Sequence, residues 1–354
     1  MSSIQNLPVE DIDIETKTVL QKLTTASRSL GLLQGKAKLI PNQSMLINFM
    51  ALREAKASSE IEQIVTTNDR LFRAMSNDDE ADPSTKEVLN YRFAILEGYR
   101  RIKERGLLSI NDMISIQERI EQNKGGIRSA PGTTLKNAKT GEVVWTPPQN
   151  ETEIRELLQN LEQYINDDDL QQIDPLLKLV FIHYQFEAIH PFYDGNGRTG
   201  RIINVLYLVL KDLLDLPILY LSSYILESKS EYYELLRNIN QDTRKIVEFA
   251  SYILDGIQQT SEKTNLIIDQ IQDSISQASQ KIKENNNSLF SYELVSAIFS
   301  EVVTRIDAVA TSLDVTRQTA SRYLKELVEL EILEEIKVGR EKIYLNKYLA
   351  ALMK

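Results

Sequence analysis

Apolar residues recur every three or four positions along most of this chain, which is the spacing that places them on one face of an α-helix. The longest such segment, residues 244–284, carries an isoleucine-rich stripe with steps of four, four, three and four. The helices expected from this pattern span residues 43–73, with an irregularity at Ser58–Ser59, and residues 86–104, 110–121, 151–165, 175–189, 198–214, 228–240 and 244–284. The chain is therefore expected to be mainly α-helical.

The helical pattern stops between residues 123 and 150. This segment holds four of the 13 glycines and three of the nine prolines, and both residue types interrupt regular helices. It also contains a short β-prone patch, Val143, Val144 and Trp145, which is closed by Pro147. We expect an extended, hairpin-like loop in this region.

The residues from 288 onward form a separate unit, preceded by a polar linker at residues 284–288. Three short helices and then two strands around a turn are expected, which is typical of a winged helix-turn-helix domain. The third helix begins with Arg317, Arg322 and Lys325 and no acid, which favours DNA as a partner. The whole unit has nine Lys and Arg against ten Asp and Glu, so a protein-binding or dimerisation module is the alternative.

Composition narrows the classes of protein. A length of 354 residues suits two or three domains, and shares of 42% apolar and 26% charged residues suit an ordinary globular chain. The absence of cysteine excludes zinc ribbons, iron–sulfur clusters, thiol catalysis and disulfides. The net charge of -10 argues against a protein that coats nucleic acid. With no visible signal peptide, and a longest apolar run (202–210) too short to span a bilayer, we expect a cytoplasmic protein without a membrane partner.

The strongest chemical signal is HPFYDGNGRTGR, from His190 to Arg201. It contains the spacing GxGxxG, which in dinucleotide-binding folds directly follows a β-strand. Here the preceding element is a helix that must end near His190, because Pro191 disfavours helical backbone in the residue before it. We therefore reject a dinucleotide-binding fold and retain a glycine-rich loop that opens a helix.

Such a loop is suited to phosphate. Its glycines let backbone N–H groups approach an anion, and the N-terminus of the next helix adds a positive dipole end. Arg198 and Arg201 lie three positions apart on one helical face and can clamp phosphates. Asp194 offers a hard oxygen of the kind that Mg²⁺ prefers, and His190 can act as a general base near neutral pH. The combination predicts a site for phosphate-transfer chemistry.

The string resembles the signature of the Fic (Fido) family, HPFx(D/E)GNGRxxR, with every fixed position filled. This resemblance implies a protein adenylyltransferase in which His190 deprotonates a hydroxyl of a target protein and Asp194 holds Mg²⁺ on ATP. AMP would pass to the hydroxyl while pyrophosphate leaves, and the glycine at 197 indicates the adenylylating rather than the kinase form. The residues that the resemblance assigns to ATP are Gly195, Asn196, Gly197, Arg198, Thr199, Gly200, Arg201, Tyr232, Tyr233 and Asn240.

An N-terminal segment resembles the inhibitory motif (S/T)xxxE(G/N) of class II members of this family. Ser58 and Glu62 fill its fixed positions, four apart on one helical face, and Gln63 departs from the expected Gly or Asn. The resemblance implies that Glu62 pairs with Arg201 and holds the site in an inhibited state.

Together these features predict a Fic/Fido helical core with a small β-hairpin flap and a C-terminal winged helix-turn-helix domain. In the family the flap positions the target side chain by strand-like pairing, and Val143, Val144 and Trp145 look like its counterpart. The expected parts are residues 1–105 with the inhibitory helix, 106–258 as the catalytic core, 259–287 as a helical linker and 288–354 as the winged helix.

Two alternatives stay open at this point. The chain could be a DNA-binding regulator whose Fic core is only a sensor, although an intact motif favours the enzyme. The same residues could also remove AMP from a modified protein, with Glu62 orienting a water molecule. Because the family often dimerises, a homodimer is a further expectation, and the sequence does not name the target protein.

Overall fold

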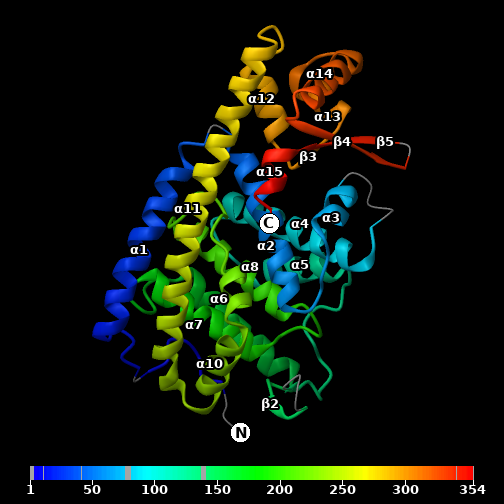
Figure 1. Cartoon of the computed structure of the whole chain (residues 1–354). Helices are drawn as coiled ribbons and strands as arrows, with labels where there is room; N and C mark the ends of the chain where they lie inside the picture. Colours follow the sequence, from blue (N-terminus) through cyan, green and yellow to red (C-terminus); the bar gives the residue numbers. More distant parts are fainter. Residues whose placement is uncertain are drawn as a thin grey trace.

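The computed structural model describes residues 4–10, 12–40, 42–75, 81–136, 141–339 and 341–353. It is mainly helical, with two small antiparallel sheets (Figure 1). The helices of the first 285 residues are α1 (Lys17–Ala37), α2 (Gln43–Ile61), α3 (Asn68–Ala74), α4 (Pro83–Arg105), α5 (Ile110–Glu121), α6 (Glu151–Asn166), α7 (Pro175–Ile189), α8 (Asn196–Leu210), α9 (Ser222–Glu227), α10 (Lys229–Gln241) and α11 (Ile246–Asn285).

Helices α7 and α8 form the centre of the core. All residues of α7 except Pro175 and Glu187 are buried, so this helix is covered on every side and is not amphipathic. It begins where the Asp174 side chain accepts a hydrogen bond from a backbone N–H, and it ends at His190 in a left-handed conformation. Helix α7 packs against α6 and α8, and α8 packs against α4 and α5. The turn between α7 and α8 is thus held by a rigid surround.

Helices α1 and α11 run side by side in the same direction along one flank (Figure 1). Three polar contacts join them, and in each the partners are 233 positions apart. Successive contacts lie seven residues further along both helices, which is the repeat of a coiled coil. They are Lys22–Asp255 at 2.6 Å, Ser29–Glu262 at 3.4 Å and Lys36–Asp269 at 2.7 Å.

The C-terminal unit follows the end of α11. Its elements are α12 (Tyr292–Phe299), β3 (Val303–Thr304), α13 (Ile306–Leu313), α14 (Arg317–Glu329), β4 (Leu333–Val338), β5 (Glu341–Asn346) and α15 (Lys347–Ala351). The strands form a sheet in the order β3-β5-β4, with both neighbouring pairs antiparallel. The three helices and the terminal hairpin occur where the sequence pattern placed them, and their classification as a winged helix stays a prediction.

The structure corrects the predicted helix over residues 43–73. The chain leaves the helix after Ile61 and starts α3 at Asn68, so the irregularity lies at residues 62–67 and not at Ser58–Ser59. The physical reason is local, because Gln63 adopts a positive φ of 66° and Thr67 caps α3 with its side chain. Helix α8 likewise ends four residues earlier than expected, at Leu210. Helices α1, α9 and α15 (Lys347–Ala351) are additions to the predicted set.

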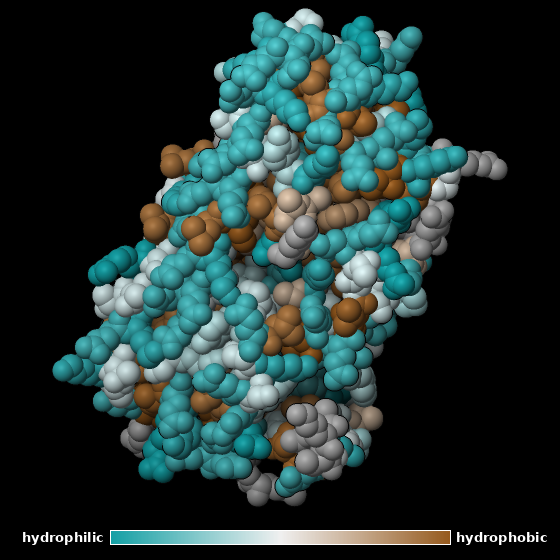
Figure 2. Space-filling model, in the orientation of Figure 1, coloured by the Kyte–Doolittle hydropathy of each residue, from teal (hydrophilic) through white to brown (hydrophobic). Residues whose placement is uncertain are grey.

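Within the described ranges, none of the helices has both the length and the apolar character needed to cross a membrane. The face shown in Figure 2 is mostly hydrophilic, and its hydrophobic side chains gather chiefly in the upper half, near the C-terminal unit.

Candidate active site

The backbone between α7 and α8 makes a tight loop whose shape depends on one asparagine. Asn196 accepts a hydrogen bond from the Phe192 N–H and donates one to the Phe192 carbonyl, both at 2.8 Å. Gly195 has a positive φ of 78°, a conformation that glycine adopts without strain. The loop therefore ends with backbone N–H groups at the N-terminus of α8. Asn196 is predicted as an ATP ligand, but both of its side-chain hydrogen bonds are made to the Phe192 backbone and hold the loop.

His190 is held at the loop entrance by a buried arginine. Arg128 is fully buried and donates to the His190 carbonyl at 2.7 Å and to the Ile189 carbonyl at 3.2 Å. Nδ1 of His190 has no hydrogen-bond partner among the described residues. Burial, helped by the positive charge of Arg128, lowers the pKa of His190 to about 4. The imidazole is therefore neutral at pH 7 and free to accept a proton.

Asp194 presents its carboxylate to solvent at the mouth of the loop. Its side chain is 77% exposed, and its Oδ1 accepts a hydrogen bond from the Gly195 N–H at 2.7 Å. The Gln117 amide fixes the backbone by donating to the Asp194 carbonyl at 3.2 Å. No cluster of three or more acidic, histidine or cysteine side chains suited to a metal is found in the described residues. A single accessible carboxylate beside phosphate-binding amides fits Mg²⁺, which keeps several waters and shares its coordination with phosphates.

Arg198 is held by two glutamates from neighbouring helices. It donates to Glu121 on α5 at 2.6 Å and to Glu87 on α4. Burial raises the pKa of Glu121 to about 7. Arg198 and Arg201, predicted to clamp phosphates, each contact carboxylates of the protein in this conformation.

Arg201 is buried and points to the end of α2. Its Nε donates to Ser58 Oγ at 2.8 Å, and its NH2 group donates to the Ser58 carbonyl at 3.1 Å and to Glu62 Oε1 at 2.8 Å. Although burial alone would raise the pKa of Glu62, the charge and hydrogen bond of Arg201 lower it below its ordinary value. The two residues of the predicted inhibitory motif therefore both contact the second arginine of the loop motif.

Two glycines of the loop motif are needed for space. A β-carbon on Gly197 would lie 2.7 Å from Glu62 Oε1 and 3.0 Å from an Arg201 nitrogen. A β-carbon on Gly200 would lie 2.7 Å from Oε1 of Glu187 on α7. Because Gly200 lets α8 approach α7 and Thr199 is fully buried in α8, these two residues shape the helix rather than face solvent.

The predicted flap is a two-stranded hairpin, β1 (Leu135–Lys136) paired antiparallel with β2 (Val143–Trp145). Val143 is exposed, and Val144 and Trp145 are half-buried. The indole of Trp145 donates to the Ala188 carbonyl at 2.9 Å, two residues before His190. The flap is therefore tied to the same helix end that carries the imidazole.

The two tyrosines assigned to adenosine differ in their surroundings. Tyr232 is buried, and its hydroxyl contacts Nε2 of His183 at 2.8 Å, so it belongs to the core. Tyr233 is 44% exposed and offers an aromatic surface that a base could stack on. Asn240 accepts a hydrogen bond from the Tyr184 hydroxyl at 2.9 Å.

Sequence reasoning missed the partners that fix this site: Arg128, Glu87, Glu121 and Gln117. They come from α4, α5 and the loop after α5, and none shares a motif with the glycine-rich string. The one available signal was that two adjacent buried arginines require nearby negative charge, which does not say which acid supplies it.

A helical core, a glycine-rich loop at a helix N-terminus, a histidine at the loop entrance and an exposed carboxylate define a protein of the Fic type. The chain belongs to the Fic/DOC family. The family's own model matches residues 104–208, the model "Fic/DOC family N-terminal" matches residues 20–100, and "Protein adenylyltransferase SoFic-like, C-terminal domain" matches residues 275–349.

Related proteins and structures agree with this assignment. The chain is 29% identical over 147 residues to protein adenylyltransferase fic-1 of Caenorhabditis elegans, which covers 40% of this chain and 27% of that protein. It is 23% identical over 187 residues to protein adenylyltransferase Fic of Drosophila erecta, covering 52% of this chain and 36% of that one. The chain thus spans roughly a quarter to a third of the length of these curated relatives.

Solved structures share the fold. A Fic family protein from Desulfovibrio desulfuricans G20 superimposes with a TM-score of 0.59 at 19% identity, covering 94% of this chain and 97% of that one. Residues 134–508 of Fic-1 from C. elegans superimpose with a TM-score of 0.54 at 21% identity, covering 71% and 75% of the two chains. The match to the first of these structures extends over nearly the whole chain.

Proposed function

We propose that this protein transfers AMP from ATP to a hydroxyl side chain of a target protein or of itself. The observation that carries the proposal is the loop between α7 and α8, where a neutral His190 stands beside the positively polarised N-terminus of α8. The family relatives named protein adenylyltransferase support the same reaction.

In the proposed reaction His190 takes the proton of the attacking hydroxyl. A new bond forms between that oxygen and the α-phosphorus of ATP, the bond from the α-phosphorus to the bridging oxygen breaks, and pyrophosphate leaves. The hydrogen bond from Arg128 to the His190 carbonyl fixes the backbone that carries the ring at the loop entrance, which supports this role. The flap, tied by Trp145, would present the target hydroxyl next to the ring.

Asp194 would hold Mg²⁺, which neutralises phosphate charge when bound. The loop N–H groups would take the phosphate oxygens, with Arg198 and Arg201 released from their carboxylates. Asp194→Ala is expected to weaken magnesium-dependent ATP binding, measured by calorimetry with and without EDTA. Equal ATP binding in all four conditions would contradict this role.

Glu62 is proposed to inhibit the transfer. It occupies the guanidinium of Arg201, which would otherwise hold the γ-phosphate, so ATP would enter with its α-phosphate out of line for attack. The buried position of Arg201 and its additional bonds to Ser58 support a stable inhibited state.

The decisive experiment incubates the protein and a cell extract with ATP labelled on the α-phosphate, using wild type and Glu62→Gly in parallel. Label on protein, absent with His190→Ala, is the expected result. Loss of label from a protein modified beforehand would instead favour removal of AMP as the dominant direction. No label transfer in either direction would favour the regulator with a sensory core.

A second role is proposed for the C-terminal unit, as a contact surface for DNA. Arg317, Arg322 and Lys325 lie on α14 and are exposed, although Arg317 pairs with Asp307 at 2.9 Å. If DNA phosphates bind there, the affinity should fall with salt, and Arg322→Ala should flatten that slope by about one charge. Absence of binding at low salt would favour a protein partner or a homodimer contact.

A cytoplasmic location stays a prediction from the sequence.

A further inference from the structure

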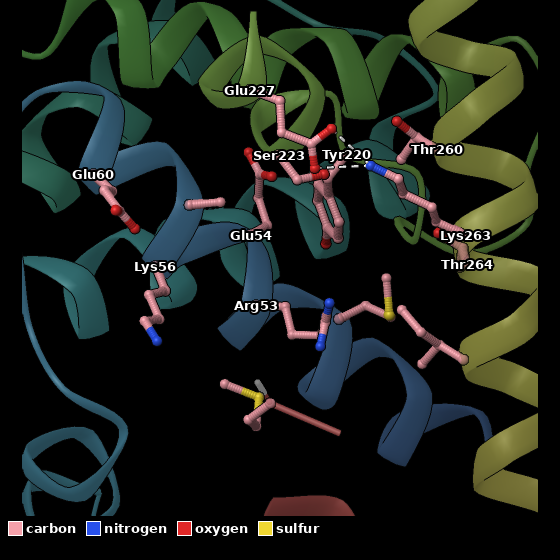
Figure 3. A pocket seen from close by; sticks show the side chains of 14 residues that line it. Arg53, Glu54, Lys56, Glu60, Tyr220, Ser223, Glu227, Thr260, Lys263 and Thr264 are labelled. Carbon is pink, nitrogen blue, oxygen red and sulfur yellow. Dashed lines mark hydrogen bonds and ion pairs between the residues drawn. The ribbon is translucent and has the colours of Figure 1, made fainter. Parts of the chain in front are cut away.

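A cavity of about 330 Å³ lies against α2, the helix that precedes Glu62, and Glu62 is not among its lining residues (Figure 3). Its walls come from α2, the segment from Tyr220 to Glu227, α11 and Met353, the second-last residue of the sequence. This volume lies at the lower end of the range of small-molecule sites. None of the residues from His190 to Arg201 lines the cavity, so it is distinct from the candidate active site.

Two buried hydroxyl groups in the cavity wall have no hydrogen-bond partner among the described residues. Tyr220 and Thr260 are each 5% exposed, and neither hydroxyl is matched by an acceptor or donor of the protein. An unmatched buried hydroxyl costs free energy, so such groups in native proteins usually meet a water or a ligand. Figure 3 places both side chains in the wall of the cavity.

The cavity also holds a cation that pairs with no carboxylate of the described residues. The guanidinium of Arg53 donates to the Leu352 carbonyl, and burial lowers the pKa of Arg53 below its ordinary value. Two further cations line the cavity. Lys263 is already paired with Glu227 at 2.8 Å, as the dashed lines in Figure 3 show, and Lys56 donates to the Asn68 side chain at 2.7 Å. Arg53 and Lys56 are thus positive charges in the cavity wall that an incoming anion would meet without first breaking an ion pair between described residues.

The rest of the wall is mixed. Its carboxyl groups are Glu227, which is paired with Lys263, Glu54, which accepts hydrogen bonds from Tyr91 and Ser222, and the exposed Glu60. Met50, Ala57, Ile267 and Met353 give the cavity an apolar lining next to the guanidinium. A ligand that satisfies the wall must therefore accept hydrogen bonds at one end and be apolar at the other.

We propose that this cavity binds a small organic anion, a carboxylate or a phosphate monoester on a short apolar body. The oxyanion would lie against Arg53 and the hydroxyls of Tyr220 and Thr260, and the apolar body against Met50 and Ile267. Such a charge-assisted contact with a guanidinium is stronger than one between neutral groups.

Occupancy would act on the inhibitory helix, and this consequence rests on the proposed function. Arg53 lies on the same helix as Ser58, and Ser58 and Glu62 hold Arg201. A ligand that binds between α2 and α11 in the present arrangement stabilises that arrangement by its binding free energy. It would therefore strengthen inhibition and lower the rate of AMP transfer.

The test uses the full chain and two anionic probes, benzoate and phenyl phosphate, with benzyl alcohol as the uncharged match. Calorimetry should show binding of at least one anion and weaker binding of the alcohol. Tyr220→Phe and Thr260→Val each remove one hydroxyl with little change of shape, and Arg53→Gln removes the charge. Each is expected to weaken anion binding, Arg53→Gln by about tenfold or more, whereas Arg155→Gln on the distant α6 should not.

The outcomes separate the site from its consequence. No binding of either anion at millimolar concentration, or equal binding to all four variants, would overturn the proposed site. Binding as expected, together with unchanged AMP transfer by wild type, would overturn the regulatory consequence alone. Failure of the Glu62→Gly variant to transfer AMP would count against the proposed function and leave the binding result standing.

Discussion

Glu62 accepts a 2.8 Å hydrogen bond from Arg201, a residue 139 positions further along the chain. Its Oε1 stands 2.7 Å from the point where a β-carbon on Gly197 would lie. The end of α2 therefore fits into space that exists because the loop motif has glycine at that position. The predicted inhibitory segment and the glycine-rich loop therefore fit each other in shape as well as in charge.

Replacing Glu62 with glycine should raise AMP transfer at least about tenfold, equivalent to roughly 1.4 kcal/mol of activation free energy. The reason is that Arg201 loses its carboxylate partner and becomes available to the γ-phosphate. Glu62→Asp should give an intermediate rate, because the shorter side chain reaches the guanidinium less well. The measurement is initial rate of label incorporation at saturating magnesium and ATP.

The matched control is Glu60→Gly, which makes the same change two residues earlier at an exposed position. It should weaken the end of α2 to a similar extent without touching Arg201. Equal rates for wild type and Glu62→Gly, or equal activation by Glu60→Gly, would show that the carboxylate of Glu62 does not restrain the site.

His190→Ala should reduce AMP transfer by about 10² to 10⁴, the usual cost of losing a general base. ATP affinity should stay close to that of wild type, because the imidazole faces the target hydroxyl in the proposed reaction and not the nucleotide. The rate of AMP transfer and the affinity for ATP, the latter measured by calorimetry, are determined for the variant and for wild type, so that the predicted loss of rate and the predicted unchanged affinity are both tested. Full turnover by the variant would remove His190 from the mechanism.

Gln63→Gly should stabilise the protein, by up to about 1 kcal/mol, because Gln63 has a φ of 66° that costs little for glycine. Gln122 ends α5 with a similar φ of 52° away from the inhibitory helix, so Gln122→Gly is the control. Both variants should raise the Tm, and only Gln63→Gly should lower basal AMP transfer by firming the end of α2. A lower Tm for Gln63→Gly would mean that the side chain outweighs its backbone strain.

Glu54 should contribute a fall in the free energy of unfolding as pH rises from about 4.5 to 7, opposite in sign to the contribution of His183 and His190, whose pKa values are lowered by burial. Burial raises the pKa of this carboxyl from 4.5 to about 7, so the folded state holds its proton more tightly than the unfolded chain does. The stabilisation that the protonated Glu54 carboxyl contributes is fully present below pH 4.5 and is lost as the pH rises through 7. Glu62 adds no slope in this window, because its pKa is lowered.

Glu54→Gln removes that titration while keeping an oxygen that can accept from Tyr91 and Ser222. The free energy of unfolding of Glu54→Gln, measured with denaturant at several pH values, should decline between pH 4.5 and 7 by about 2 kcal/mol less than that of wild type. Glu60→Gln, an exposed site on the same helix, should leave the decline unchanged. An identical pH dependence in wild type and Glu54→Gln would contradict the assignment.

The parts of the fold that could be predicted are those governed by local rules. Helix α7 was predicted with its observed bounds, because Pro175 suits a first turn and Pro191 forbids continuation. The break after Ile61 was misplaced, because the positive φ of Gln63 follows from packing around the helix end and not from the preference of glutamine. The position of the loop after α7 could be predicted in the same way. The glycines of the motif, like the prolines at the ends of α7, act directly on the backbone conformation.

The rest of the site could not be predicted because it is made by long-range contacts. Arg128 reaches the His190 carbonyl from 62 positions away, and Glu87 reaches Arg198 from 111 positions away. Neither residue has a local pattern that distinguishes it from a solvated charge. The pairing of Glu62 with Arg201 was expected only through the resemblance to a family, and the structure places the two side chains in contact.

The polar contacts between α1 and α11 fix how α1 is positioned along the axis of α11. Because the polar partners repeat every seven residues, a displacement of α1 along α11 by one full repeat, about 10 Å of helix, brings Lys22 opposite Glu262, the next acidic residue of the series. Any slip of α1 separates Lys22 from Asp255 and Lys36 from Asp269. The N-terminal helix thus has a single registered position over the range of motion open to a folded protein, and inserting seven residues into it would preserve the phase where inserting three or five would not.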